Sequence, residues 1–182
     1  MALVGKPCPT IGGLTFVKGD PLSIPTKGTP IVVELWAEWC GPCRVAFPHL
    51  SSLQRKYKSR GLRIVGVCTE DDVTRTRRFV EQQGSNMDYT VAVDSRGEVG
   101  ERLMTAAGVH GIPHAFIIDA KGIIRHHGHP LEPKFEQVLQ QVVSEAGARQ
   151  GPPASYTTAD RAFVAEQRLR RFEQQQQQQQ GT

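Results

Sequence analysis

Apolar residues follow two different patterns along this chain. Residues 31–33 and 62–68 are short runs rich in β-branched side chains, a pattern typical of strands that are buried on both faces. After Pro42 the apolar residues instead recur at the spacing of a helix: Val45, Phe47, Leu50, Leu53 and Tyr57. Alternation of the two patterns predicts an α/β domain with right-handed crossovers between parallel strands and helices on both faces of a central sheet.

Turn residues divide the rest of the first 147 residues into further elements. The expected elements are strands at 14–16 and 22–24, a helix at 71–84, a strand at 89–93, a helix at 98–107, a strand at 115–119, an edge strand at 122–125 and a helix at 131–145. A stretch of this length is ample for one core and too short for two. We therefore expect one domain over residues 1–147.

The composition changes after Gly147. Residues 149–155 read as a linker, residues 159–172 could form one amphipathic helix, and residues 174–180 are all glutamine. We interpret residues 148–182 as a linker, a short helix and a polyglutamine tail that is largely disordered. The alternative is a helix that docks onto a partner.

Two thiols mark the junction between the strand at 31–33 and the helix that follows it. Cys40 and Cys43 are spaced so that both face one helical turn. Unpaired N–H groups and the positive end of the helix dipole stabilise a thiolate at such a junction, so the Cys40 pKa should fall below about 8.5. Cys40 is then the nucleophile, and Cys43, about one turn further in, resolves the mixed disulfide. Gly41 permits a tight turn, and Pro42 suits a first helical position.

Residues 33–43 resemble the active-site segment of thioredoxins, and Pro48 matches the proline that bends the long helix of that family. Gly111-Ile112-Pro113, just before an apolar strand, resembles the family's cis-proline loop. The inserted helix and strand at 71–93 and the N-terminal hairpin resemble TlpA/ResA-like thioredoxins of the AhpC/TSA type. The resemblance implies a thioredoxin fold: a central mixed β-sheet flanked by helices, with an N-terminal β-hairpin and an inserted α-β unit.

The resemblance also implies roles for the loop residues. Pro113 would pack against the dithiol, and Ile112 would offer its backbone to an extended substrate. His114 departs from the threonine common at that place, and it either tunes the thiols or is a partly exposed loop histidine. Trp36 and Trp39 would border the substrate groove together with Gly41 and Pro42, although core or rim packing explains both tryptophans equally well.

Glu34 lies six residues before Cys40, where thioredoxins carry a buried aspartate. Burial without a partner would raise the pKa of this carboxyl group. As a hypothesis, Glu34 relays the proton of Cys43 through water during resolution. The alternative is a carboxylate at the end of the strand that reaches solvent.

These features favour a thiol-disulfide oxidoreductase that reduces protein disulfides, with the Cys40–Cys43 disulfide and no other cofactor. Its expected partners are disulfide-containing proteins and an upstream thiol/disulfide reductase, and we expect a monomer. A peroxiredoxin-like peroxidase is the nearer alternative, but such a centre has threonine or serine three residues before its cysteine, where this chain has Ala37.

A metal-binding module is the more distant alternative. A structural zinc site needs four ligands, and Cys8 and Cys68 stand alone in the sequence. In extended geometry His127 and His129 share a face while His126 points away. We therefore expect no metal site.

The formal net charge of +4 is too small to predict nucleic-acid binding. Arg75, Arg77 and Arg78 cluster without aromatic neighbours, so we interpret them as a solvated helix face. Long apolar runs are absent, and we expect no membrane span. The sequence starts without a signal-like segment, which predicts a cytoplasmic protein, or an extracytoplasmic one if the sequence has been trimmed.

Overall fold

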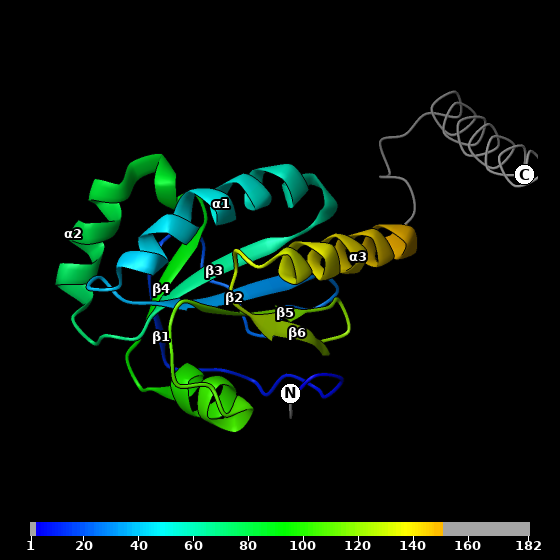
Figure 1. Ribbon diagram of the computed structural model, residues 1–182, viewed down its shortest axis with the longest axis horizontal. Helices are drawn as coiled ribbons and strands as arrows, with labels where there is room; N and C mark the ends of the chain where they lie inside the picture. The colour runs from blue at the N-terminus through cyan, green and yellow to red at the C-terminus, as the bar shows by residue number, and fades with distance from the viewer. Residues whose placement is uncertain (1–2, 151–182) are drawn as a thin grey trace, which may run out of the picture. The chain divides into compact units, whose positions relative to one another are not determined.

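A mixed sheet of six strands forms the centre of the computed structural model, which describes residues 3–150 (Figure 1). The strands are β1 (Leu14–Lys18), β2 (Ile31–Trp36), β3 (Arg63–Cys68), β4 (Thr90–Asp94), β5 (His114–Ile118) and β6 (Ile124–Gly128). The helices are α1 (Gly41–Tyr57), η1 (Lys58–Arg60), α2 (Val73–Gln83), η2 (Gly84–Met87), the π-helix η3 (Gly100–Thr105) and α3 (Pro133–Gln150).

The strand order across the sheet is β1-β4-β3-β2-β5-β6. β2, β3 and β4 are mutually parallel neighbours, whereas β1, β5 and β6 each pair antiparallel. This arrangement confirms the predicted α/β fold with a mixed sheet. The inserted unit supplies α2 and β4. At the N-terminus β1 pairs with β4, and a bridge between Ile11 and Ile24 closes the hairpin-like segment.

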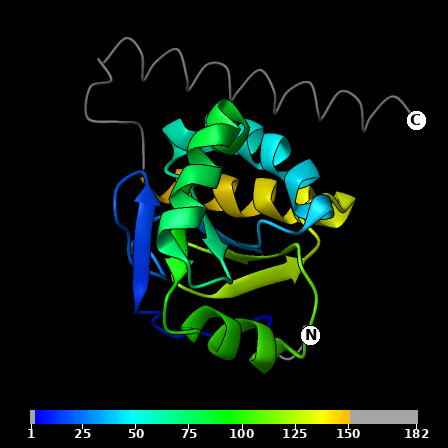
Figure 2. The same ribbon diagram turned by 90° about the vertical axis from the view of Figure 1, so that its left-hand side faces the viewer.

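Helices cover both faces of the sheet, which explains why β2 is apolar at nearly every position. α1, α2 and α3 lie on one face, and η3 lies on the other together with the N-terminal segment (Figures 1 and 2). Alternate residues of β2 enter the two cores: Val32 packs among α-helical residues such as Phe47 and Phe135, and Val33 packs with Leu103 on the opposite face. All six residues of β2 are buried.

The structure differs from several of the predicted elements. The strand expected at 22–24 is reduced to the isolated bridge of Ile24 with Ile11, and the edge strand expected at 122–125 lies at 124–128. The helix expected at 98–107 contains π-helical turns at η3, and the closing helix starts at Pro133 and continues to Gln150. Cys8, which lies between two prolines, is buried. The predicted amphipathic helix and polyglutamine tail lie outside the described residues, and the division into residues 1–147 and 148–182 stays a prediction.

Candidate active site

The helix α1 starts at the dithiol. Cys40 is its N-cap residue, with extended backbone angles (φ −82°, ψ 99°), and its Sγ accepts a hydrogen bond of 3.2 Å from the backbone N–H of Cys43. Gly41 and Pro42 occupy the first helical positions, where a proline removes only an N–H that would have no partner in the helix. The site therefore places sulfur 40 against the unpaired N–H groups of a helix start, which favours negative charge on that sulfur.

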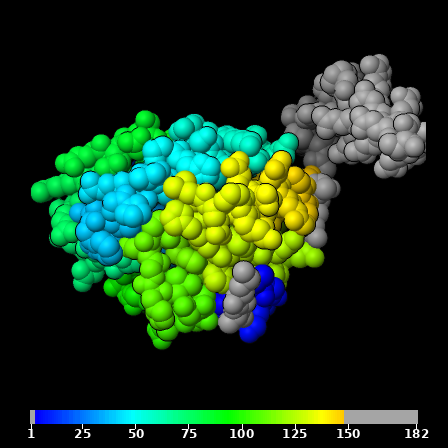
Figure 3. Space-filling model, in the orientation of Figure 1, coloured from blue at the N-terminus to red at the C-terminus, as the bar shows by residue number. Residues whose placement is uncertain are grey.

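Cys40 and Cys43 form a disulfide bond. Cys43 is fully buried, and Cys40 is slightly more exposed at 3%. In the space-filling view the light-blue start of α1 lies at the surface, beside the green segment that leads into β5 (Figure 3). The order of exposure agrees with the order expected from the sequence, in which the first thiol meets the substrate.

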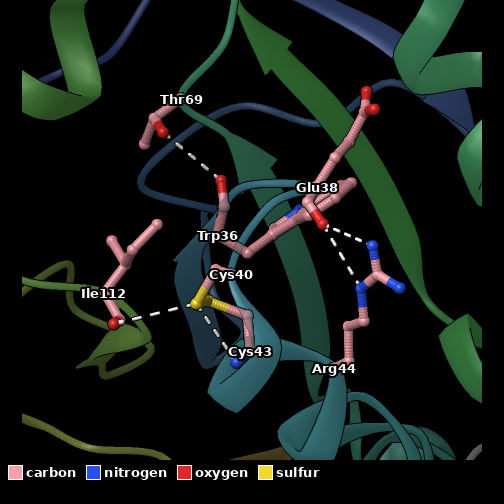
Figure 4. The surroundings of a disulfide bond; sticks show 7 residues. All are labelled: Trp36, Glu38, Cys40, Cys43, Arg44, Thr69 and Ile112. Atoms are coloured by element: carbon pink, nitrogen blue, oxygen red, sulfur yellow. Dashed lines mark hydrogen bonds between the residues drawn. A yellow bond between two sulfur atoms is a disulfide. The ribbon is translucent and has the colours of Figure 1, made fainter.

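The loop before β5 approaches the disulfide from the other side. The peptide bond between Ile112 and Pro113 is cis, as the resemblance implied. The carbonyl oxygen of Ile112 lies 3.8 Å from Cys40 Sγ (Figure 4). Pro113 is buried, while Ile112 is half-buried and Gly111 is exposed. The segment thus presents backbone at the rim of the disulfide.

Glu34 is completely buried on the sheet face that carries α1. Neither carboxylate oxygen has a hydrogen-bond partner among the described residues. Burial raises the pKa of this carboxyl group well above its ordinary value of 4.5. The alternative of a carboxylate that reaches solvent is therefore wrong.

A small polar cluster surrounds Glu34, and Gly66 of β3 makes room for it. A β-carbon on Gly66 would lie 3.1 Å from Glu34 Oε2, 3.2 Å from Trp36 Nε1 and 2.9 Å from Tyr89 Cε2. Trp36 Nε1 and the Tyr89 hydroxyl, like the carboxylate, are buried and without a hydrogen-bond partner among the described residues. Burial, and next the charge of Glu34, raise the pKa of Tyr89 well above its ordinary value.

The two tryptophans occupy different environments. Trp36 is fully buried and contacts Phe47 edge-on and Phe79 in a stacked arrangement. It lies beneath the surface rather than at the rim of a groove. Trp39 is 69% exposed, and Val45 of α1, one of the apolar residues that predicted this helix, is 65% exposed. Trp39, which directly precedes Cys40 in the chain, is thus the exposed aromatic side chain next to the dithiol.

His114 has a partner that sequence reasoning missed. Its Nε2 lies 3.0 Å from Nδ1 of His127 on β6, and both rings pack against Phe116. Burial, and next the charge of His127, lower the His114 pKa to about 4. His114 is therefore a neutral imidazole near neutral pH. It shares its sheet face with Phe116, whose side chain belongs to the core opposite α1.

A second group missed from the sequence is Glu38 with its partners. Arg75, interpreted as part of a solvated face, forms an ion pair with Glu38 at 2.8 Å, and Thr76 donates to the same carboxylate at 3.1 Å. Thr76 is polar at a position that shares its helix face with Val73 and Val80. A threonine on an otherwise apolar face is the signal that could have revealed this contact.

The remaining metal-ligand candidates lie apart. Cys8 and Cys68 are buried free thiols, and His126 hydrogen-bonds to Glu132 at 2.8 Å. Within the described part of the chain no three histidine, cysteine or acidic side chains gather as metal ligands would.

Comparisons with known proteins agree with this geometry. The family model described as the AhpC/TSA family matches residues 6–127. The thiol:disulfide interchange protein DsbE of Escherichia coli K12 is 33% identical over 141 residues, which cover 73% of this chain and 69% of that protein. The thiol-disulfide oxidoreductase ResA of Bacillus thuringiensis is 28% identical over 142 residues, covering 76% and 78%. A crystal structure of a putative DsbE from Chlorobium tepidum is 27% identical, with a TM-score of 0.61, covering 79% and 97%.

These relatives correct one expectation. A cytoplasmic location was predicted from the start of the sequence, but DsbE and ResA are extracytoplasmic or periplasmic proteins. The fold gives no information on the compartment, because a fold of this kind is the same on either side of a membrane. Within residues 3–150 no helix is both long enough and apolar enough to cross a bilayer.

Proposed function

The chain belongs to the AhpC/TSA family, and from this premise we propose that its thiol-disulfide oxidoreductase activity is the reduction of protein disulfides, with Cys40 as nucleophile and Cys43 as resolving thiol. The observation that carries the proposal is the position of Cys40 at the N-cap of α1. There its sulfur accepts the Cys43 N–H at 3.2 Å and forms a disulfide with a fully buried partner.

The reaction has two exchange steps. In the reduced protein the Cys40 thiolate attacks one sulfur of the substrate disulfide, forms a mixed disulfide and expels the other substrate sulfur as a thiolate. Cys43 then loses its proton and attacks the Cys40 sulfur. The mixed disulfide breaks, the second substrate thiolate leaves, and the Cys40–Cys43 disulfide remains.

Glu34 is the proposed group that holds the proton of Cys43 during the second step. Burial raises the pKa of this carboxyl toward the operating pH, so its ionised form is a stronger base than an ordinary glutamate and can take the Cys43 proton. Glu34 and Cys43 lie on the same side of the sheet, and the relay between them would pass through water.

Substrate docking is assigned to the exposed rim around the disulfide. Trp39, Gly41 and Pro42 are exposed there, and the backbone of Ile112 faces Cys40 across the cis-proline loop formed with Pro113. Trp36 lies below this rim and supports it by packing. His114 acts on the site only through β5, because its ring packs on the far side of the sheet with Phe116 and His127.

Each turnover leaves the protein oxidised, so an upstream dithiol donor must reduce it again. Outside the cytoplasm, where thiols are oxidised again, the protein acts as a reductant only as long as this donor supplies electrons. The proposed substrates are proteins with an accessible disulfide. The peroxidase alternative needs a hydroxyl side chain three residues before the cysteine, but this chain has a buried alanine at residue 37.

Insulin reduction in the presence of dithiothreitol tests the proposal. The wild type should accelerate precipitation of the insulin B chain, Cys40→Ser should be inactive, and Cys43→Ser should accumulate mixed disulfides that trap substrates. Cys8→Ser, which removes a free thiol far along the chain from the dithiol, is the matched control. Normal turnover by Cys43→Ser, or an inactive wild type, would contradict the two-thiol mechanism.

A further inference from the structure

The loop that carries Cys40 is attached to the inserted helix α2 through one carboxylate. The side chain of Glu38, two residues before Cys40, points away from the disulfide (Figure 4). Its Oε2 accepts a hydrogen bond from Arg75 Nε at 2.8 Å, and its Oε1 accepts one from Thr76 Oγ1 at 3.1 Å. Glu38 is only 9% exposed. A largely buried charge is tolerated because it is paired and hydrogen-bonded on both oxygens.

The backbone of the same loop is held by two other elements. The carbonyl oxygen of Glu38 accepts hydrogen bonds from Arg44 of α1, the shorter of them 2.7 Å from Nη2 (Figure 4). The carbonyl oxygen of Trp36 accepts one at 3.0 Å from the N–H of Thr69, just after β3. The loop is therefore fixed by α1, by the end of β3 and, through Glu38, by α2.

The start of α2 is built around this contact. Asp72, the N-cap of α2, accepts a hydrogen bond from the backbone N–H of Arg75 at 2.9 Å. The guanidinium of Arg75 also pairs with Glu70 at 3.1 Å. These contacts orient Arg75 toward the loop before any substrate binds.

The Glu38 contact matters most when the disulfide is open. In the oxidised protein the bond between Cys40 and Cys43 itself restrains the loop. After reduction this covalent restraint is gone, and the hydrogen bonds and packing of the loop keep Cys40 Sγ at the N-cap of α1, where the N–H of Cys43 stabilises a thiolate. We propose that Glu38, held by Arg75 and Thr76, is a positioning residue that keeps Cys40 at the start of α1 in the reduced protein. The inference rests on the proposed role of Cys40 as nucleophile.

The test is the pH profile of Cys40 alkylation by iodoacetamide in the reduced protein, combined with the reduction potential measured against glutathione. Glu38→Ala and Arg75→Gln should shift the midpoint of the profile to higher pH, so that alkylation at pH 7 slows by roughly three- to tenfold. The reduction potential should become more negative, because the reduced form loses stabilisation of its thiolate. Glu38→Gln keeps the length of the side chain and one acceptor oxygen, so it should shift the profile less than Glu38→Ala.

Arg78→Gln is the matched control, because it removes the same charge from an exposed position of the same helix. Equal profiles and equal potentials for Glu38→Ala and Arg78→Gln would overturn the proposal. If Glu38→Ala does not fold, the variants Glu38→Gln and Arg75→Gln and their combination test the proposal instead. Because both substitutions remove the same contact, the double variant should shift the alkylation profile by less than the sum of the two single shifts. Additive shifts would refute it. Failure of the wild type to reduce insulin is a separate result, and it would remove the proposed function itself.

Discussion

Replacing Glu34 with glutamine should remove a pH dependence of stability that one buried carboxyl imposes on the oxidised protein. Burial raises the pKa of Glu34 well above its ordinary value of 4.5, and neither oxygen has a hydrogen-bond partner among the described residues. In the unfolded chain the same carboxyl loses its proton near the ordinary value. Between the two pKa values the unfolded state binds fewer protons than the folded state, so the free energy of unfolding falls as the pH rises.

A difference of one bound proton changes the free energy of unfolding by roughly 1.4 kcal/mol per pH unit. The largest loss that this one carboxyl can cause between pH 5 and pH 7, relative to Glu34→Gln, is therefore about 3 kcal/mol, and the fraction of it observed reports how far burial raises the folded-state pKa. For a domain of this size, that upper limit corresponds to about 6–12 °C in Tm.

The assay is thermal unfolding of the oxidised proteins at the two pH values, followed by circular dichroism. Glu81→Gln is the matched control, because Glu81 is an exposed glutamate of α2. The gap in Tm between Glu34→Gln and the wild type should widen from pH 5 to pH 7, whereas the gap for Glu81→Gln should stay constant. A constant gap for Glu34→Gln would show that the folded carboxyl ionises at an ordinary pH, and the proposed proton acceptor would lose its physical basis.

Two further substitutions test the surroundings of the site. The pKa of His114 is lowered to about 4, so the wild type should lose stability as the pH falls below about 6.5. His114→Gln should reduce this loss by roughly 1 kcal/mol at pH 5, after a discount for the partial exposure of the ring. Urea unfolding at several pH values measures the effect, and the same pH dependence in variant and wild type would contradict it. Gly66→Ala should cost about 1–3 kcal/mol, because its β-carbon would lie 2.9 Å from Tyr89 Cε2 in a packed interior. Gly100→Ala, with no atom within 4 Å of the new carbon, is the control, and equal stability of the two variants would refute the packing argument.

Most of the fold can be predicted from the spacing of apolar residues, because that spacing indicates whether an element is a helix or a strand and which of its faces are buried. The β-branched run of β2 could be read as a strand buried on both faces, and all of its residues are buried. Val45 shows where the same reasoning fails. It lies two residues before Phe47, which is roughly the opposite side of a helix, so its apolar character helps to predict the helix but not the buried face. Its 65% exposure follows from that angle.

The dithiol and its loop could be predicted because their chemistry is local in sequence. A cysteine at a strand-to-helix junction meets the same helix start whatever the rest of the chain does, and the N-cap geometry of Cys40 follows from its neighbours. Burial of Glu34 is of the same kind, since β2 is covered on both faces.

Contacts between distant elements could not be predicted, because they depend on sheet register and helix placement rather than on spacing. His114 meets His127 because β5 and β6 pair antiparallel with Phe116 opposite His127, and one sequence does not reveal that register. Arg75 meets Glu38 because α2 lies over the loop after β2. From the sequence alone, Arg75 cannot be distinguished from Arg78, because both arginines lie on the exposed face of the same helix. The buried Thr76 beside it is the residue that separates the two cases, since a hydroxyl on an apolar face requires a polar partner, and here that partner is the loop of the dithiol.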